Sequence, residues 1–260
     1  MLKFLILLLF LTMFSRGAAG NVFKQAIDFS KSVVAKQEKR DQEYADKVAE
    51  GLHQLVNLSR ERAAKSIASQ PDYFRTVRDS GLKMFLPAEI NPYKTIIEYK
   101  GFDTLKVNKL ELEMSKAAQR SIAECDPIVK EKIDSLYFPD PVNMATGGLK
   151  VNFKASSYFS EVTYDDLLLA CAPVVSIILE TNDFKVLESE LTAIYDQLAI
   201  VDRPVLDLRA HVTKVALRGF FDAIYKQEMK IRENPEATAN PEVIFALTPP
   251  IDPIISLDYK

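Results

Sequence analysis

Asp207 and His211 have the clearest spacing for acid–base chemistry in this sequence. They lie four positions apart in the segment LDLRAH, so a helix would place both side chains on one face. A carboxylate that orients an imidazole can make the histidine a general base or a metal ligand. The spacing implies no third polar group, and a carboxylate at a helix start beside an ordinary histidine gives the same pattern. Asp207 and His211 are therefore weak catalytic candidates.

Other signatures of metal, cofactor or nucleophile chemistry are missing from the sequence. The two histidines, His53 and His211, lie far apart, and the two cysteines form no pair at metal-ligand spacing. No Gly-x-Ser-x-Gly segment marks a nucleophilic serine. Cys171 lies in the apolar run LLLACAPVV, which disfavours a thiolate. We expect no metal and no cofactor, and no local motif supports an enzyme.

The adjacent glycines Gly147 and Gly148 do not form a phosphate-binding loop. Such a loop needs a preceding strand, glycines at fixed spacing and a Lys-Ser or Lys-Thr pair. Here the glycines follow a proline-containing stretch, and Lys150 is followed by Val151. The pair instead predicts a joint between two helices, where glycine permits a positive φ angle.

The N-terminus has the pattern of a signal peptide. Lys3 precedes an apolar run from Phe4 to Phe14, and small residues follow where a signal peptidase would cut. The run is shorter than the roughly 20 residues that span a bilayer. We expect residues 1–19 to be removed, leaving a secreted or extracytoplasmic product without a transmembrane segment. An uncleaved membrane anchor is the alternative.

Export bears on Cys125, Cys171 and Asn57. An oxidising compartment would allow the two cysteines to form a disulfide. The bond would close a loop of about 46 residues and contribute roughly 4 kcal/mol in the chain-entropy account. Two buried thiols are the alternative, because cysteine in an apolar run behaves as a small hydrophobe. Asn57-Leu58-Ser59 is an N-glycosylation sequon, whose use requires Asn57 to face solvent.

Composition indicates an ordinary folded protein that does not bind nucleic acid. The chain has 33 basic and 36 acidic residues, a net charge of −3 and no basic block, whereas non-specific nucleic-acid binding needs a positive field. The hydrophobic share of 48% and the charged share of 27% are typical of globular domains. A chain of 260 residues can form one sizeable core without disulfides or metals.

Apolar residues recur at helical spacing along most of the chain, and no two-residue alternation is long enough to build a sheet. The predicted class is all-α, an irregular multi-helix bundle. Helices are expected over 22–69, 93–138, 185–198 and 206–233, with a further helix through the apolar run 167–179. Gly101 and Asp126-Pro127 should break the second of these helices.

The pattern also predicts a domain organisation. Residues 20–45 are crowded with charges and should form a helical arm. Residues 46–246 should form a single helical domain. Residues 247–260 contain three prolines and should form an extended tail.

The run 167–179 is nearly all apolar, and a helix that is apolar all round belongs in the middle of a bundle. Thr163, followed by Asp165 and Asp166, suits the start of this helix, because a hydroxyl caps free amides and early carboxylates meet the positive end of the helix dipole. Bundles can also open a cavity for an apolar ligand. Five aromatic residues either line such a cavity or fill the core: Phe153, Tyr158, Phe159, Phe220 and Phe221.

Three segments carry a family likeness. MSKAAQRSIAECDPIVKEKI is a helix rich in paired alanines, and ATGGLKVNFKASSYFSEVTYDDLLLACAPVV combines a glycine-containing joint with a Tyr-Phe pair and a Thr-x3-Leu run. LDLRAHVTKVALRGFFDAIYKQEMKIRENP is a closing helix with a Glu and an Ile-Arg-x-Asn-Pro element. Together they resemble DUF4197, a family of exported, mostly bacterial proteins of unknown function, over roughly residues 45 to 246. The resemblance implies an all-helical exported domain and no established activity, and His211 stands where the family usually has an aromatic residue.

These features favour a secreted, non-catalytic binding module for an apolar small molecule or a protein partner. A buried apolar cavity or an exposed apolar patch would support this function. A structural protein of a matrix or envelope, acting through its charged arm and tail, is one alternative. An enzyme of unrecognised class is another, and it would need Asp207 and His211 to meet a third polar group in a cleft.

Overall fold

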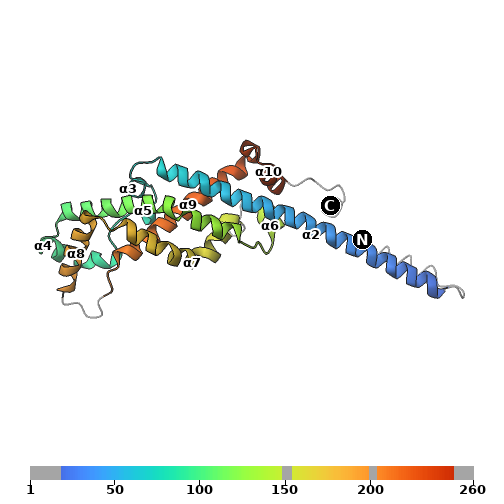
Figure 1. The fold of residues 1–260 in the computed structure, drawn as a ribbon, viewed down its shortest axis with the longest axis horizontal. Helices are drawn as coiled ribbons and strands as arrows, with labels where there is room; N and C mark the ends of the chain where they lie inside the picture. The colour runs from blue at the N-terminus through green and yellow to red at the C-terminus, as the bar shows by residue number, and fades with distance from the viewer. Residues whose placement is uncertain (1–18, 148–153, 199–203, 249–260) are drawn as a thin grey trace. The chain divides into compact units, whose positions relative to one another are not determined.

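The structure is a computed structural model that describes residues 19–147, 154–198 and 204–248 (Figure 1). Every regular element within these ranges is a helix, which confirms the all-α prediction. Most of the predicted signal peptide and most of the predicted tail lie outside the described residues. The chain divides into two units, residues 1–47 and residues 48–260.

Helix α2 (Ala19–Ala68) is 50 residues long and confirms the helix predicted over 22–69. It supplies all the described residues of the first unit, where most side chains from 24 onward are exposed to solvent, as the charged sequence of the arm predicts. From Val48 onward α2 belongs to the second unit, and most of its apolar side chains there are buried.

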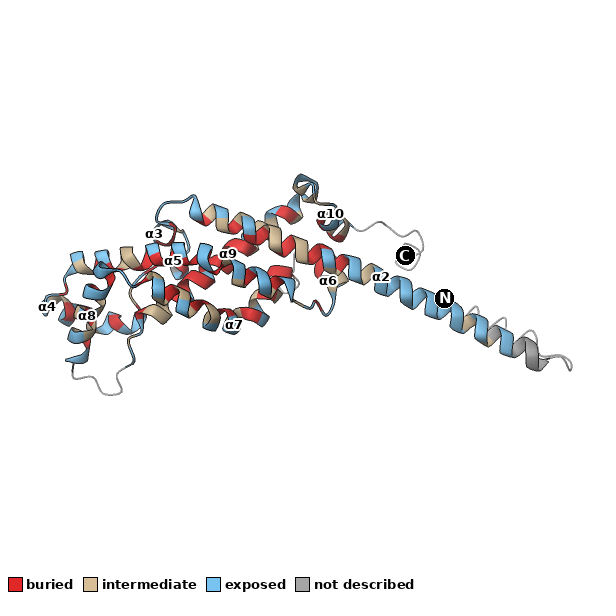
Figure 2. Cartoon of the chain, viewed as in Figure 1, coloured by how far each residue is buried: buried red, intermediate tan, exposed pale blue. Residues whose placement is uncertain are grey.

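The second unit continues with a series of helices of unequal length. They are α3 (Tyr73–Thr76), α4 (Lys94–Tyr99), α5 (Thr104–Asp134), α6 (Pro141–Thr146), α7 (Ala155–Ile178), α8 (Asn182–Asp196), α9 (Leu208–Glu233) and α10 (Pro241–Leu247). Short 3-10 helices lie at Ser80–Leu82, Ala88–Tyr93 and Pro235–Thr238. Helices α5, α7 and α9 pack against one another, and Figure 2 shows buried residues along their facing sides. This packing forms the centre of the core.

Helix α5 contradicts the break predicted at Asp126-Pro127, because it runs without interruption from Thr104 to Asp134 with Pro127 inside it. Proline removes one intrahelical hydrogen bond, yet Cys125 and Val129 on either side of it are buried in the core. Their packing holds the helix together past the proline. The break predicted at Gly101 is confirmed, since Gly101 lies between α4 and α5 with a φ angle of 98°.

The joint before α7 also differs from the prediction. Helix α6 lies within the stretch expected to be a loop, and Gly147 ends it with a φ angle of −62°, so a positive φ at Gly147 was a wrong prediction. Gly148 lies outside the described residues. Helix α7 begins at Ala155 rather than at Thr163, and Thr163 Oγ1 donates to the Phe159 carbonyl at 2.7 Å inside the helix.

Among the described residues, no single helix is long and apolar enough to cross a membrane. Helices α7 and α8 meet the length and composition test only as a pair, and they are bent by 107° relative to each other.

Candidate functional site

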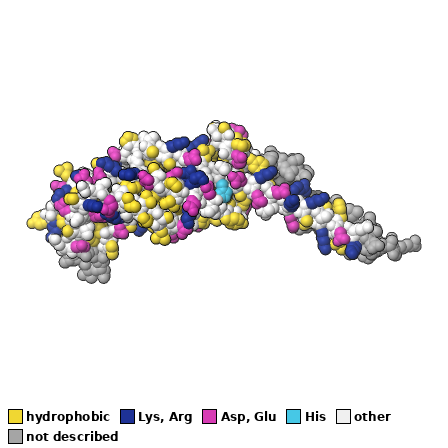
Figure 3. All heavy atoms as spheres, in the orientation of Figure 1, with side chains coloured by type: hydrophobic (Ala, Val, Ile, Leu, Met, Phe, Trp, Pro, Cys, Tyr) yellow, Lys and Arg dark blue, Asp and Glu magenta, His cyan; other side chains and the backbone are white. Residues whose placement is uncertain are grey.

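Helix α7 exposes a row of apolar side chains on its outer surface. Val162 is 48% exposed, Leu169 is 76% exposed and Ile177 is 73% exposed, and Pro173 between them is also exposed. At 3.6 residues per turn these four positions fall within one narrow stripe. We call Val162, Leu169, Pro173 and Ile177 the α7 face. Figure 3 shows hydrophobic side chains gathered over the part of the surface where Figure 1 places α7.

The other side of α7 explains why the sequence predicted a central helix. A second row recurs every four residues and packs into the core towards α5 and α9: Phe159, Thr163, Leu167, Cys171 and Val175. Helix α7 does pack at the centre of the core with α5 and α9, but burial on every side, which its apolar sequence predicted, is wrong. The helix is apolar on two sides, and the α7 face is not used by the core.

Pro173 adds a backbone polar group to the α7 face. Proline has no N–H group, so the carbonyl of Leu169, four residues earlier, lacks the N–H donor that a helix normally supplies to it. Both residues are exposed. Any molecule that covers the face must therefore supply a donor to this carbonyl or leave it a water molecule.

Two carboxylates lie along the α7 face, and both have cationic partners. Asp166 lies within the stripe, between Val162 and Leu169, and pairs with Lys132 on α5 at 2.7 Å. Glu180 follows the last turn and pairs with Lys185 at 2.5 Å and with Arg209 at 2.6 Å, and these contacts hold the pKa of Glu180 below its ordinary value. A molecule that covers the face would not need to neutralise these two carboxylates.

A buried polar cluster fixes the start of α7. The carboxylate of Glu228 on α9 is fully buried and accepts hydrogen bonds from Ala155 N at 3.2 Å, from Ser156 N at 2.8 Å and from Ser156 Oγ. Arg232 donates from Nε to Glu228 at 2.7 Å and from its other nitrogens to the carbonyls of Ala145 and Met144 in α6. Glu228 thus caps α7, and Arg232 ties that cap to α6.

Sequence reasoning missed the role of Glu228. The residue caps a helix 73 positions away, and no local pattern marks such a long-range cap. Two signals were present: the four-residue spacing of Glu228 and Arg232, and the Glu and Ile-Arg-x-Asn-Pro element of the family likeness. Lys154, which precedes α7, is also buried, and burial together with the Arg232 charge lowers the pKa of its ammonium group.

A family profile described as a protein of unknown function, DUF4197, matches residues 43–244. The chain belongs to the DUF4197 family. The match confirms the resemblance read from the three sequence segments, and it includes α7 and the Glu228 cluster. No curated protein and no solved structure matches this DUF4197 chain.

The weak catalytic candidates of this DUF4197 protein have other hydrogen-bond partners. Asp207 caps α9 by accepting from Ala210 N at 2.8 Å. The Nε2 atom of His211 lies 2.9 Å from the Phe85 carbonyl, to which it donates in the matching tautomer, and burial lowers the pKa of His211. Glu111 on α5 accepts from Leu86 N at 3.1 Å.

His211 and Glu111 therefore hold the two ends of one peptide group, between Phe85 and Leu86. This arrangement fastens the segment before α4 to α5 and α9. It accounts for both titratable side chains without a reaction. The catalytic assignment of Asp207 and His211 remains a prediction.

The cysteine prediction also remains open. Cys125 on α5 and Cys171 on α7 are both buried and are free thiols in the structure. Their contact, together with burial, raises the pKa of the Cys125 thiol. A disulfide between α5 and α7 stays a prediction.

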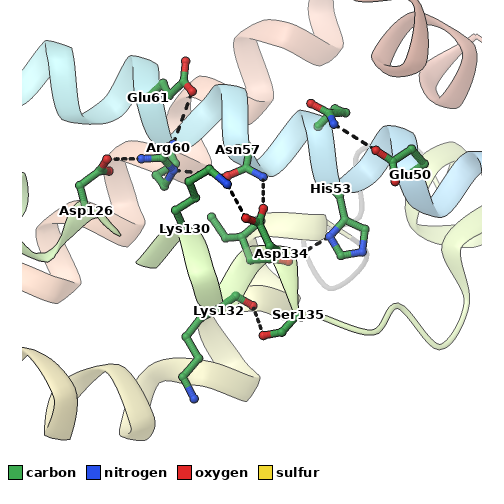
Figure 4. A network of polar contacts seen from close by, with 12 residues as sticks. Glu50, His53, Asn57, Arg60, Glu61, Asp126, Lys130, Lys132, Asp134 and Ser135 are labelled. Carbon is green, nitrogen blue, oxygen red and sulfur yellow. Dashed lines mark hydrogen bonds and ion pairs between the residues drawn. The ribbon is translucent and has the colours of Figure 1, made fainter. Parts of the chain in front are cut away.

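Asn57 belongs to a polar network that joins α2 to α5 (Figure 4). Its amide donates to Asp134 at 2.9 Å and accepts from Arg60 at 3.4 Å, and Arg60 also pairs with Asp126. The sequon hydroxyl of Ser59 is fully buried and donates to the Leu55 carbonyl. A glycan at Asn57 would have to displace these contacts, and glycosylation stays a prediction.

Four of the five candidate aromatic residues are described, and they contact other rings or the core. The rings of Phe159 and Phe221 lie 5.6 Å apart and those of Phe138 and Tyr158 lie 6.0 Å apart, while Phe220 is buried. These contacts favour the core-filling alternative. Phe153 lies outside the described residues. Within the described ranges, no group of three or more His, Cys, Asp or Glu side chains is placed to hold a metal ion.

Proposed function

We propose that this DUF4197 protein is a binding module that docks a protein partner on the α7 face. The observation that carries the proposal is the exposure of Leu169 and Ile177, at 76% and 73%, on a helix whose opposite row already serves the core. Contiguous exposed apolar residues on a folded protein mark interaction sites more often than scattered ones. A polar residue at either position would leave the core unchanged, so folding alone does not explain them.

The chemistry of the α7 face favours a protein over a lipid or an apolar small molecule. Small-molecule sites are concave, whereas the α7 face is the outer surface of a single helix. The Leu169 carbonyl, which Pro173 deprives of its donor, would be costly to bury in hydrocarbon. A protein interface can supply a donor or retain a bridging water at that point.

The size of the α7 face indicates a modest affinity. Full burial of a Val, Leu or Ile side chain contributes roughly 1.5–3 kcal/mol, and association costs at least about 4 kcal/mol in lost freedom. Three exposed side chains therefore give a net gain of a few kcal/mol at most. The partner must also contact neighbouring residues, and reversible binding is expected.

A structural role through the arm is the second candidate. The first unit exposes Phe29 at 70% and Val34 at 53%, and a helix without packed neighbours is only marginally stable in water. Loss of self-association on deletion of residues 21–45 would support this role.

Export of the protein is also part of the proposal. The intact mass of the protein purified from its own source would show whether the chain is cleaved after residue 19.

The docking proposal is tested by photo-crosslinking in cells that make the protein. A benzophenone amino acid replaces Leu169 in one variant and Val186 in a control variant. Val186 lies on α8 and is 64% exposed, so it matches Leu169 in chemistry and exposure. We expect one discrete protein adduct at position 169 and none of that mass at position 186. Equal labelling at both sites, or lipid adducts alone at 169, would contradict the proposal.

A further inference from the structure

We infer that the partner of the α7 face is a second copy of this chain, with the two α7 helices packed antiparallel about a two-fold axis. The inference rests on the proposed docking function and specifies its partner. Three features carry it: the placement of the apolar side chains along α7, the placement of charges at its two ends, and the extent of the exposed row.

The apolar positions of the α7 face are nearly symmetric along the helix. Val162 lies seven residues before Leu169, and Ile177 lies eight residues after it. A two-fold axis between Leu169 and Ala170 therefore sets Val162 against Ile177 of the partner subunit, and the Leu169 side chains of both copies meet near the axis. Ala170 is small and half-exposed, which allows the helices to approach closely. The same patch serves both copies, as a two-fold interface requires.

Charge placement selects the antiparallel orientation. Glu161, Asp165 and Asp166 are exposed near the first half of α7. A parallel pair would set each of these carboxylates beside its own copy, and like charges in that position are unfavourable. In the antiparallel pair each carboxylate lies away from its own copy: along the axis the two Asp166 residues, the nearest pair, are seven residues or about 10 Å apart, and the two Glu161 residues are seventeen residues or about 25 Å apart. These separations reach or exceed the Debye length of about 8–10 Å at moderate salt.

The far end of α7 is electrically balanced. Glu180 pairs there with Lys185 and Arg209, and Arg209 also pairs with Glu188. The antiparallel arrangement sets the exposed carboxylate of Glu161 towards this balanced cluster of the partner subunit, whereas a parallel pair sets Glu161 against its own copy. Charge therefore favours antiparallel over parallel pairing.

The extent of the row indicates a weak, reversible dimer. Four side chains on one helix cover less than the roughly 800 Å² per partner of a standard stable interface. We expect a monomer–dimer equilibrium that shifts over a roughly hundredfold range of concentration. Sedimentation velocity should show this shift, and Leu169→Lys should weaken association at least about tenfold. Val186→Lys is the matched control and should leave the equilibrium unchanged.

Single-cysteine variants test the orientation directly. Cysteines pair only when their Cα atoms approach within about 7 Å. Leu169→Cys should therefore crosslink to itself. Val162→Cys and Ile177→Cys should each fail to crosslink alone, because two-fold symmetry holds identical residues about 22 Å apart along the axis. A mixture of these two variants should crosslink. The unaltered chain is the background control, since Cys125 and Cys171 are buried.

The outcomes separate the inference from the docking function. Self-crosslinking of all three variants would show a parallel pair and overturn the antiparallel arrangement. A monomer at every concentration, together with a photo-adduct between position 169 and another protein, would overturn the second-copy inference and keep the docking function. A monomer without any photo-adduct specific to position 169 would overturn both. Because the three positions are exposed, unchanged circular dichroism and melting temperature should confirm that each variant folds.

Discussion

Glu228→Ala is expected to lower the free energy of unfolding by about 3–5 kcal/mol. The carboxylate is fully buried and accepts from two backbone N–H groups at the start of α7, from Ser156 Oγ and from Arg232 Nε. Its removal leaves those N–H groups without a cap, a change that costs roughly 0.5–2 kcal/mol. It also leaves Arg232, whose side chain is only 10% exposed, without its anion. Removal of one member of a buried ion pair is the larger effect.

Urea unfolding followed by circular dichroism measures this loss. Glu233→Ala is the control, because Glu233 lies on the same helix but is exposed, and surface changes usually stay within about 0.5 kcal/mol. In a thermal scan the Glu228→Ala loss corresponds to a fall in melting temperature of roughly 6–20 °C. The Glu228→Leu/Arg232→Met double variant should be more stable than Glu228→Ala, because no uncompensated buried charge remains.

A Glu228→Ala loss below about 1 kcal/mol would refute this reasoning. Such a result would mean that the desolvation of Glu228 offsets its hydrogen bonds, as occurs for some buried ion pairs. A double variant no more stable than Glu228→Ala would show that the unpaired guanidinium is not the source of the loss. Either result would move the explanation for the start of α7 from the polar cluster to the apolar packing around Phe159, which is fully buried.

Burial holds the pKa of His211 below its ordinary value, so the unfolded chain binds more protons than the folded one once the pH falls below about 6.5. The free energy of unfolding should therefore fall as the pH is lowered from there to the pKa of His211 in the folded protein. His211→Gln keeps a donor for the Phe85 carbonyl and should show a shallower fall, measured by urea unfolding at several pH values. The same dependence on pH in both proteins would show that His211 is not the source of the fall. Cys125 and Cys171 are buried. In their reduced form they should react with a maleimide at least about tenfold more slowly in the folded protein than in urea. Equal reaction rates would show that the two thiols are accessible in the folded protein. A Cβ atom at Gly219 would lie 2.5 Å from Phe74 Cε1. Gly219→Ala should therefore lower the free energy of unfolding, measured in urea, by about 1–3 kcal/mol. An unchanged free energy would mean that the Phe74 ring can move aside.

Local sequence signals predicted the helices whose ends are set locally. The helix expected over 206–233 corresponds to α9 (Leu208–Glu233). Its start depends on Asp207, which caps the first turn, and its end on the following Asn234-Pro235. Amphipathic spacing between these signals is sufficient to place the helix, because no distant residue is needed to satisfy its ends.

Tertiary contacts explain where local signals failed. Pro127 is a helix breaker in isolation, but the packing of Cys125 and Val129 in the core outweighs the lost hydrogen bond. Thr163 has the sequence context of an N-cap, yet the cap of α7 is Glu228 from another helix. Neither effect has a local signature, since both depend on residues that approach only in the folded chain.

The sequence failed to predict the exposure of the α7 face for a different reason. In an amphipathic helix the polar positions show which side faces solvent. The run 167–179 has few polar residues, so its sequence predicted burial on all sides. The structure buries Leu167 and Cys171 but exposes Leu169 and Ile177.

A helix that is apolar on two sides needs two explanations. The core explains the inner row, because replacement of Leu167 or Val175, both almost fully buried, would open a cavity. Nothing within the described chain covers the outer row. If folding were the only constraint, Leu169 could be lysine at little cost in stability. The two rows should therefore separate by experiment: inner substitutions should lower the free energy of unfolding, and outer ones should lower association while leaving unfolding unchanged. A Leu169→Lys variant that unfolds more easily as a monomer would show that the outer row belongs to the fold after all.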